Sequence, residues 1–129
     1  MNDKSFLKKK LLIVDDEPNI RLLIKRIFEE EFTVFEAENG RKGFDMAMEQ
    51  TPDVILMDVM MPGSDGMYAL NEMKSHTQTS RIPVIMLTGV GYELSERQAK
   101  SLGANGYMRK PIKPPHIPVS PQAFGLTFA

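Results

Sequence analysis

Short apolar runs and longer amphipathic stretches alternate along this chain of 129 residues. The short runs are rich in valine, isoleucine and leucine, a pattern typical of strands buried on both faces of a parallel sheet. Phe32–Phe35 mixes apolar and polar residues, which favours a strand at the edge of the sheet. The five expected strands are Leu11–Val14, Phe32–Phe35, Val54–Met57, Val84–Leu87 and a weaker one at Gly106–Met108.

Apolar residues at helical spacing occupy the segments between these runs. The first such segment follows Asp16, Glu17 and Pro18, whose acids and proline suit the start of a helix. Because a helix follows a strand at least four times, the pattern predicts a doubly wound parallel α/β sandwich. The expected helices are Ile20–Phe28, Arg41–Glu49, Met67–Lys74 and Glu93–Leu102, the last one stopped by Gly103.

A proline-rich segment stands where a fifth helix would close the sandwich. Five of the nine prolines follow Lys110, and each lacks an N–H and disfavours helical backbone in the residue before it. We therefore expect one domain over residues 1–112 and an extended proline-rich tail or linker over residues 113–129. The tail is apolar and carries no charge after Lys113, so we expect it to cover the vacated sheet face, in its own chain or in a swapped dimer.

The composition excludes several classes of protein. A net charge of −1 argues against nonspecific binding to nucleic acid or to an anionic membrane. The chain has no cysteine, so it can build neither a disulfide nor a thiolate metal site, which fits a cytoplasmic protein. The apolar run Leu11–Val14 meets Asp15 after four residues and is too short for a signal core or a membrane span. We therefore expect a protein or small-molecule partner.

Polar residues follow most of the expected strands. Asp15 and Asp16 follow the first strand, Asp58 the third, Thr88 the fourth and Lys110 the fifth. Ligands of open parallel sheets bind at the carboxyl ends of the strands. We therefore expect three carboxylates, a hydroxyl and an ammonium group to meet at one edge of the sheet.

This set of groups suits phosphoryl chemistry. Carboxylates that lie close together repel one another, so they either take up protons or recruit a cation. In the absence of cysteine and of a nearby histidine, oxygen ligands favour a hard ion, and Mg²⁺ is the natural candidate. A carboxylate can accept a phosphoryl group covalently, while metal, lysine and hydroxyl stabilise the transferred oxygens.

The motifs at these strand ends resemble those of the receiver domain of two-component response regulators. They are, in order, IVDDEPN, LMDVMMPGSDG, VIMLTG and YMRKP. The resemblance covers about Lys9 to Lys113. It implies a flavodoxin-like fold with strand order 2-1-3-4-5, here with four helices and a non-helical C-terminal tail in place of the last helix.

The resemblance also implies the roles of the site residues. Asp58 would accept a phosphoryl group from a phosphohistidine of a sensor histidine kinase or a phosphotransfer protein, assisted by Thr88 and Lys110. The hydroxyl of Thr88 and the ring of Tyr107 would form the switch that reports phosphorylation. The implied ligands of Mg²⁺ are Asp15, Asp16, Asp58 and the backbone carbonyl of Met60.

A protein of this kind is a signalling phosphoacceptor rather than an enzyme, because it catalyses only its own phosphorylation and dephosphorylation. We expect neither nucleic acid nor a membrane as a direct partner. The downstream target or output domain is not encoded in these motifs, and a homodimer stays open.

Two alternatives come from other classes of protein. A hydrolase of the haloacid-dehalogenase type also places an aspartate nucleophile after a parallel strand, but it needs a second acid two residues later, where this chain has Met60. An interaction module would keep the fold and signal by dimerisation without phosphorylation. The intact acid set argues against that module, whereas the missing fifth helix favours it.

Overall fold

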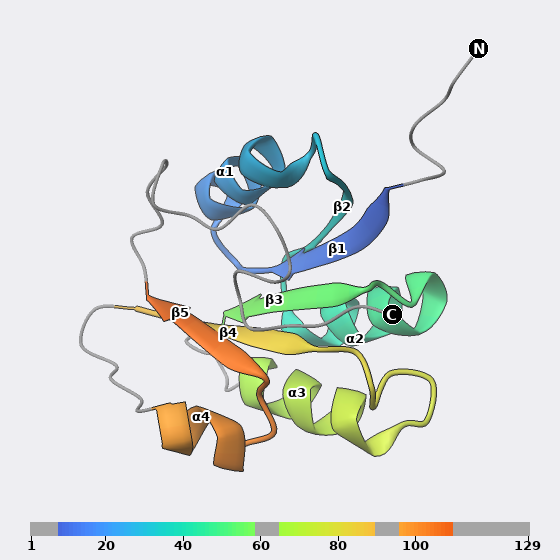
Figure 1. Ribbon diagram of the computed structural model, residues 1–129, viewed down its shortest axis with the longest axis vertical. Coiled ribbons are helices and arrows are strands. Elements are labelled where there is room, and N and C mark those ends of the chain that lie inside the picture. Colours follow the sequence, from blue (N-terminus) through green and yellow to red (C-terminus); the bar gives the residue numbers. More distant parts are fainter. Residues whose placement is uncertain (1–7, 59–64, 90–95, 110–129) are drawn as a thin grey trace.

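The computed structural model describes residues 8–58, 65–89 and 96–109, which form a parallel sheet with helices on both faces (Figure 1). The strands are β1 (Lys9–Val14), β2 (Phe32–Ala37), β3 (Val54–Asp58), β4 (Val84–Thr88) and β5 (Gly106–Arg109). The helices are α1 (Pro18–Phe28), α2 (Gly40–Gln50), α3 (Asp65–Ser75) and α4 (Glu96–Ser101). The expected proline-rich tail lies outside the described residues.

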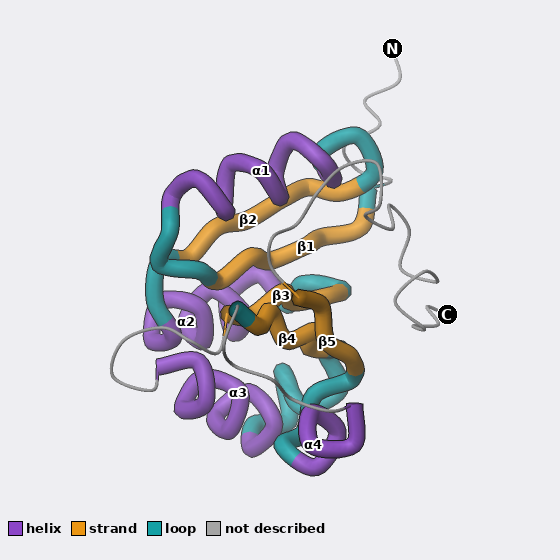
Figure 2. The backbone as a smooth tube through the Cα atoms, turned by 90° about the vertical axis from the view of Figure 1, so that its left-hand side faces the viewer, coloured by secondary structure: helices purple, strands orange, loops and turns teal. Residues whose placement is uncertain are grey.

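The sheet has the strand order β2-β1-β3-β4-β5, and every described pair of neighbouring strands is parallel. The prediction of a doubly wound α/β fold with order 2-1-3-4-5 is therefore confirmed. The mixed strand β2 occupies one edge, as its sequence indicates. Figure 2 shows α1 on one side of the sheet and α2, α3 and α4 on the other.

Several strands extend beyond their apolar runs. β3 continues to Asp58, which pairs with Leu87, and β4 continues to Thr88, which pairs with Arg109. β2 continues to Ala37, which pairs with Val14. The strand pairing thus continues beyond the apolar residues. It includes two polar site residues, Asp58 and Thr88, as the last residues of β3 and β4.

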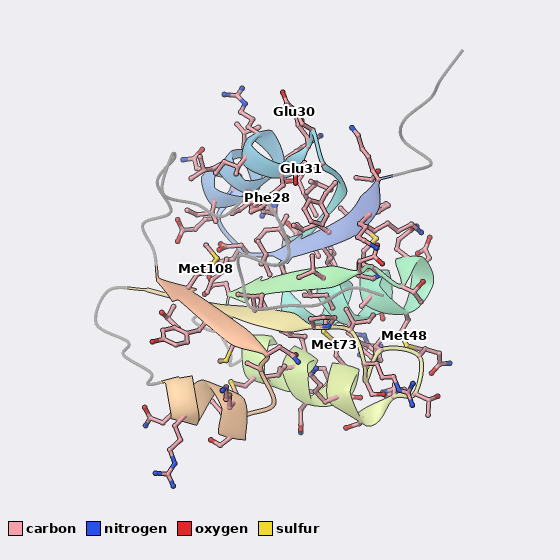
Figure 3. All side chains as sticks on the ribbon, in the orientation of Figure 1. Phe28, Glu30, Glu31, Met48, Met73 and Met108 are labelled. Atoms are coloured by element: carbon pink, nitrogen blue, oxygen red, sulfur yellow. The ribbon has the colours of Figure 1, made fainter. Side chains whose placement is uncertain are left out.

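Each face of the sheet has its own apolar core. On the α1 side, Ile24 and Phe28 pack with alternate strand residues such as Ile13 and Leu56. On the other side, Leu70 and Met73 of α3 pack with the intervening strand residues, such as Leu12 and Met57. Phe28 and Met73 each lie between their helix and the sheet (Figure 3). Burial on both faces explains why the strand sequences are continuously apolar.

The helix ends follow local chemistry. Pro18 opens α1, and the side chain of Asn39 caps α2 by accepting a hydrogen bond from the N–H of Lys42 at 2.8 Å. The residue after α2, Thr51, caps its C-terminus and has a left-handed backbone with φ of 43°. Within the described ranges, no helix combines the length and hydropathy that a membrane span requires.

Candidate functional site

The register of the strands brings three of the predicted site residues, Asp15, Asp58 and Thr88, to one edge of the sheet. Val14 at the end of β1 pairs with Met57 of β3, so Asp15, the first residue after β1, and Asp58, the last residue of β3, are the next positions along the chain. Asp58 pairs with Leu87, and Thr88 follows directly. This edge is the carboxyl edge, where open parallel sheets bind their ligands.

Asp15 begins a loop that hydrogen bonds hold on several sides. Its side chain is buried, and its backbone N–H donates to the carbonyl of Ala37 at 3.1 Å. Its Oδ1 atom accepts from the backbone N–H of Glu17 at 2.8 Å, and its carbonyl oxygen accepts from Nη1 of Arg21 at 2.7 Å. The loop therefore has a defined backbone between β1 and α1.

The carboxylates of this loop converge. Asp15, Asp16 and Glu17 each offer an oxygen, and these atoms lie within 4.8 Å of one another. Glu17 was not among the residues predicted for the site from the sequence. The available signal was its place as the third acid of the run Asp15-Asp16-Glu17, which the sequence interpretation assigned to the start of a helix.

Asp58 is the last residue of β3, and only 2% of it is exposed. A carboxylate removed from water in this way is costly unless other groups stabilise it. Its backbone is fixed by the ladder with β4, so its position relative to the strand ends is defined by the sheet rather than by a loop.

Thr88 and Tyr107 lie in the adjacent strands β4 and β5. The hydroxyl of Thr88 donates to the carbonyl of Met108 at 3.3 Å, a long hydrogen bond, and 1% of the residue is exposed. Tyr107 is partly buried and packs against the core on the side of α2, α3 and α4. Met108 faces the α1 side instead (Figure 3).

The donor set fits a hard divalent cation. The converging atoms are all carboxylate oxygens, and they come from a loop that is open on one side, since Asp16 and Glu17 are exposed. Such a set suits Mg²⁺, which takes few protein ligands and keeps several waters. Met60 and Lys110, which were also predicted for the site, lie outside the described residues.

Comparison with known proteins decides the family. The family model described as the response regulator receiver domain matches residues 11–120. The chemotaxis protein CheY of Halobacterium salinarum is 39% identical over 112 residues, which span 86% of this chain and 92% of that protein. The chain belongs to the response regulator receiver family.

Other relatives agree with this assignment. The transcriptional regulatory protein SrrA of Staphylococcus aureus is 38% identical to this chain over 112 residues, which span 86% of this chain and 45% of SrrA. The structure of the chemotaxis protein CheY4 of Vibrio cholerae superposes with a TM-score of 0.74 at 30% identity, covering 83% of this chain and 90% of that one. The receiver domain is thus similar both to proteins of about its own length and to part of a longer one.

The family match extends to residue 120 and therefore includes the first part of the proline-rich tail. Receiver domains are signalling phosphoacceptors of two-component systems. The confirmed resemblance therefore excludes the haloacid-dehalogenase alternative for this chain, and it leaves the roles of individual residues to be argued from their geometry.

Proposed function

We propose that this receiver domain accepts a phosphoryl group on Asp58 from a phosphohistidine of a sensor histidine kinase or phosphotransfer protein, in the presence of Mg²⁺. The observation that carries the proposal is the strand register. It puts Asp58 beside the loop Asp15-Asp16-Glu17, here called the acid loop, and one ladder position from Thr88. An oxygen of Asp58 forms the bond to phosphorus while the P–N bond breaks. The imidazole leaves with the electron pair and takes up a proton from solvent.

The acid loop would hold the cation. Asp15 and Asp16, with Asp58 and the backbone carbonyl of Met60, are the proposed ligands, and Glu17 would add a third negative charge from the same loop. When bound, Mg²⁺ neutralises charge on the phosphoryl oxygens. The exposure of Asp16 and Glu17 leaves that side of the loop accessible to a donor.

Thr88, Lys110 and Tyr107 complete the proposal. Among the described residues, the hydroxyl of Thr88 has one hydrogen-bond partner, the carbonyl of Met108, and that bond is long, so Thr88 can exchange this partner for a phosphoryl oxygen at small cost. Lys110 directly follows the strand residue that pairs with Thr88, and we assign its ammonium group to the same oxygens. Tyr107 is the proposed residue that reports the new hydrogen bond of Thr88 to the surface. It lies in β5, two residues before Arg109, which pairs with Thr88.

Phosphorylation by small donors tests the proposal. The protein is incubated with Mg²⁺ and either an acyl phosphate or a phosphoramidate, which has the P–N bond of phosphohistidine, and its intact mass is recorded. We expect wild type to gain the mass of one phosphoryl group, and we expect no gain with Asp58→Asn or after the metal is chelated. Asp45→Asn, at an exposed aspartate of α2, is the matched control and should be modified normally.

An unmodified wild type with both donors would contradict the proposal and favour the interaction module. Modification that persists in Asp58→Asn would place the phosphoryl group on another residue. The two donors together separate a lack of phosphoacceptor chemistry from poor reactivity with one leaving group.

A further inference from the structure

Arg21 lies beside the acid loop, although the sequence motifs give it no role. Its Nη1 atom donates to the carbonyl oxygen of Asp15 at 2.7 Å, and its Nε atom lies 3.4 Å from Oε1 of Glu36. Only 16% of its side chain is exposed. One guanidinium group therefore joins the end of β1, the end of β2 and the first turn of α1.

The position of Arg21 is unfavourable for the helix itself. It stands in the first turn of α1, where the positive end of the helix dipole disfavours a cation, and the nearest acids, Asp15, Asp16 and Glu17, precede this turn rather than lie within it. Helical side chains point back toward the N-terminus, which directs Arg21 toward the loop. The residue thus opposes a local preference, and its contacts with Asp15 and Glu36 are the compensating gain.

We propose that Arg21 is a positioning residue for the proposed cation site, to which the acid loop contributes Asp15 and Asp16. The inference rests on the proposed function, because it assumes that these carboxylates bind a divalent ion. A planar guanidinium can hold two acceptors in fixed directions, whereas an ammonium group is a point charge without that geometry. By fixing the carbonyl of Asp15, Arg21 restricts the loop to the arrangement in which its carboxylates converge.

Charge and geometry predict opposite effects of removing Arg21. If the residue acted only through its charge, its loss would leave the acids less neutralised, and a cation would bind more tightly. If Arg21 positions the loop, its loss increases the conformational freedom of the carboxylates. Cation binding must then order them at an entropic cost, so the cation binds more weakly. Groups that orient metal ligands from outside typically contribute about tenfold or more in metal affinity.

Titration with Mn²⁺ as the probe separates these effects. Free Mn²⁺ is measured by electron paramagnetic resonance with the full chain, at low and at high ionic strength. We expect Arg21→Met and Arg21→Lys each to weaken binding about tenfold. The weakening should persist at high salt, where a charge effect is screened. Arg26→Met, at an exposed arginine of the same helix, should leave the affinity unchanged.

The outcomes are distinguishable. Equal or tighter binding by Arg21→Met, or wild-type affinity in Arg21→Lys, overturns the positioning role and leaves the proposed function intact. Absence of Mn²⁺ binding by wild type overturns both. Circular dichroism at the titration temperature shows that each variant is folded, and Arg21→Lys, which keeps the charge, carries the test if Arg21→Met does not fold.

Discussion

Asp58 combines near-complete burial with a position next to the acid loop, and its replacement should therefore affect stability as well as function. Without a metal, removing this carboxylate relieves repulsion from Asp15 and the cost of keeping a charge from water. We expect Asp58→Ala to be more stable than wild type by about 1 kcal/mol in the presence of a chelator. Thermal unfolding measures the difference.

The same variant should lose its advantage when Mg²⁺ is added, because the metal stabilises only the protein that binds it. Asp45→Ala is the control, since Asp45 is exposed and its pair with Arg41 at 3.7 Å contributes little. A lower melting temperature for Asp58→Ala in chelator would show that other contacts of Asp58 outweigh the repulsion.

Gly43 allows α2 to approach β1 closely. A Cβ atom at this position would lie 2.8 Å from Cγ2 and 2.9 Å from Cγ1 of Val14, distances that require the structure to shift. We expect Gly43→Ala to be destabilised by about 1–3 kcal/mol, since overpacking exceeds the gain in helix propensity. Urea unfolding measures this change.

Val14 directly precedes Asp15, so the same substitution should also weaken divalent-cation binding. Gly89→Ala is the matched control, because a Cβ atom there would have no neighbour within 4 Å among the described residues. Addition of Val14→Ala to Gly43→Ala should recover part of the loss that the clash causes. If the double variant were destabilised by the sum of the two single effects, the clash would not be the cause.

At the scale of the elements, Lys74 links three segments at the amino edge of the sheet, opposite the site. It lies in the last turn of α3, and its Nζ atom donates to the carbonyl of Ile82 and to Oδ1 of Asn105, both at 3.1 Å. The same Oδ1 atom accepts from the N–H of Val84 at 3.0 Å. Burial lowers the pKa of Lys74 below its ordinary value of 10.5.

This pKa shift predicts how stability depends on pH. Below the folded-state pKa, both states carry the proton, and the cost of burying the charge is fully present. Between that pKa and 10.5 the unfolded state binds more protons, so stability rises with pH. We expect wild type to gain stability relative to Lys74→Met as the pH rises from neutral toward 10.5.

Urea unfolding of both proteins across this range measures the gain, and Lys25→Met, at an exposed lysine of α1, is the control. A constant difference between wild type and Lys74→Met across the range would show that the half-buried ammonium carries no such cost. The hydrogen bonds to Ile82 and Asn105 then would account for the whole effect of the substitution.

At the scale of the molecule, the sequence predicted the sheet better than it predicted the contacts around the site. Strands buried on both faces must be apolar throughout, so their positions and the polar residues that follow them are visible in the chain. The contact of Arg21 with Asp15 and Glu36 is not visible, because it joins three elements whose relative positions only the fold sets. Glu17 was missed because an acid before a proline also suits a helix start.

The sheet face that carries α1 is wider than that helix. α1 makes its main contacts with β1 and β2, yet Ile85 and Leu87 of β4 face the same side and are buried. The prolines that follow Lys110 disfavour a helix there, and the segment after Lys113 is uncharged and rich in apolar residues. We predict that this segment covers β4 and β5 on the α1 side, either within one chain or between two.

Deletion of residues 117–129 should therefore lower the melting temperature or cause aggregation. Exposure of a few hundred Å² of apolar surface corresponds to several kcal/mol at about 25 cal/mol per Å². Deletion of residues 1–7, which precede β1, is the control. Sedimentation over a range of concentrations separates cover within one chain from a swapped dimer, because only the dimer dissociates on dilution. A truncated protein that stays monodisperse and melts like wild type would show that the segment is an ordinary linker. The apolar residues of this sheet face would then be buried by α1 and by one another alone.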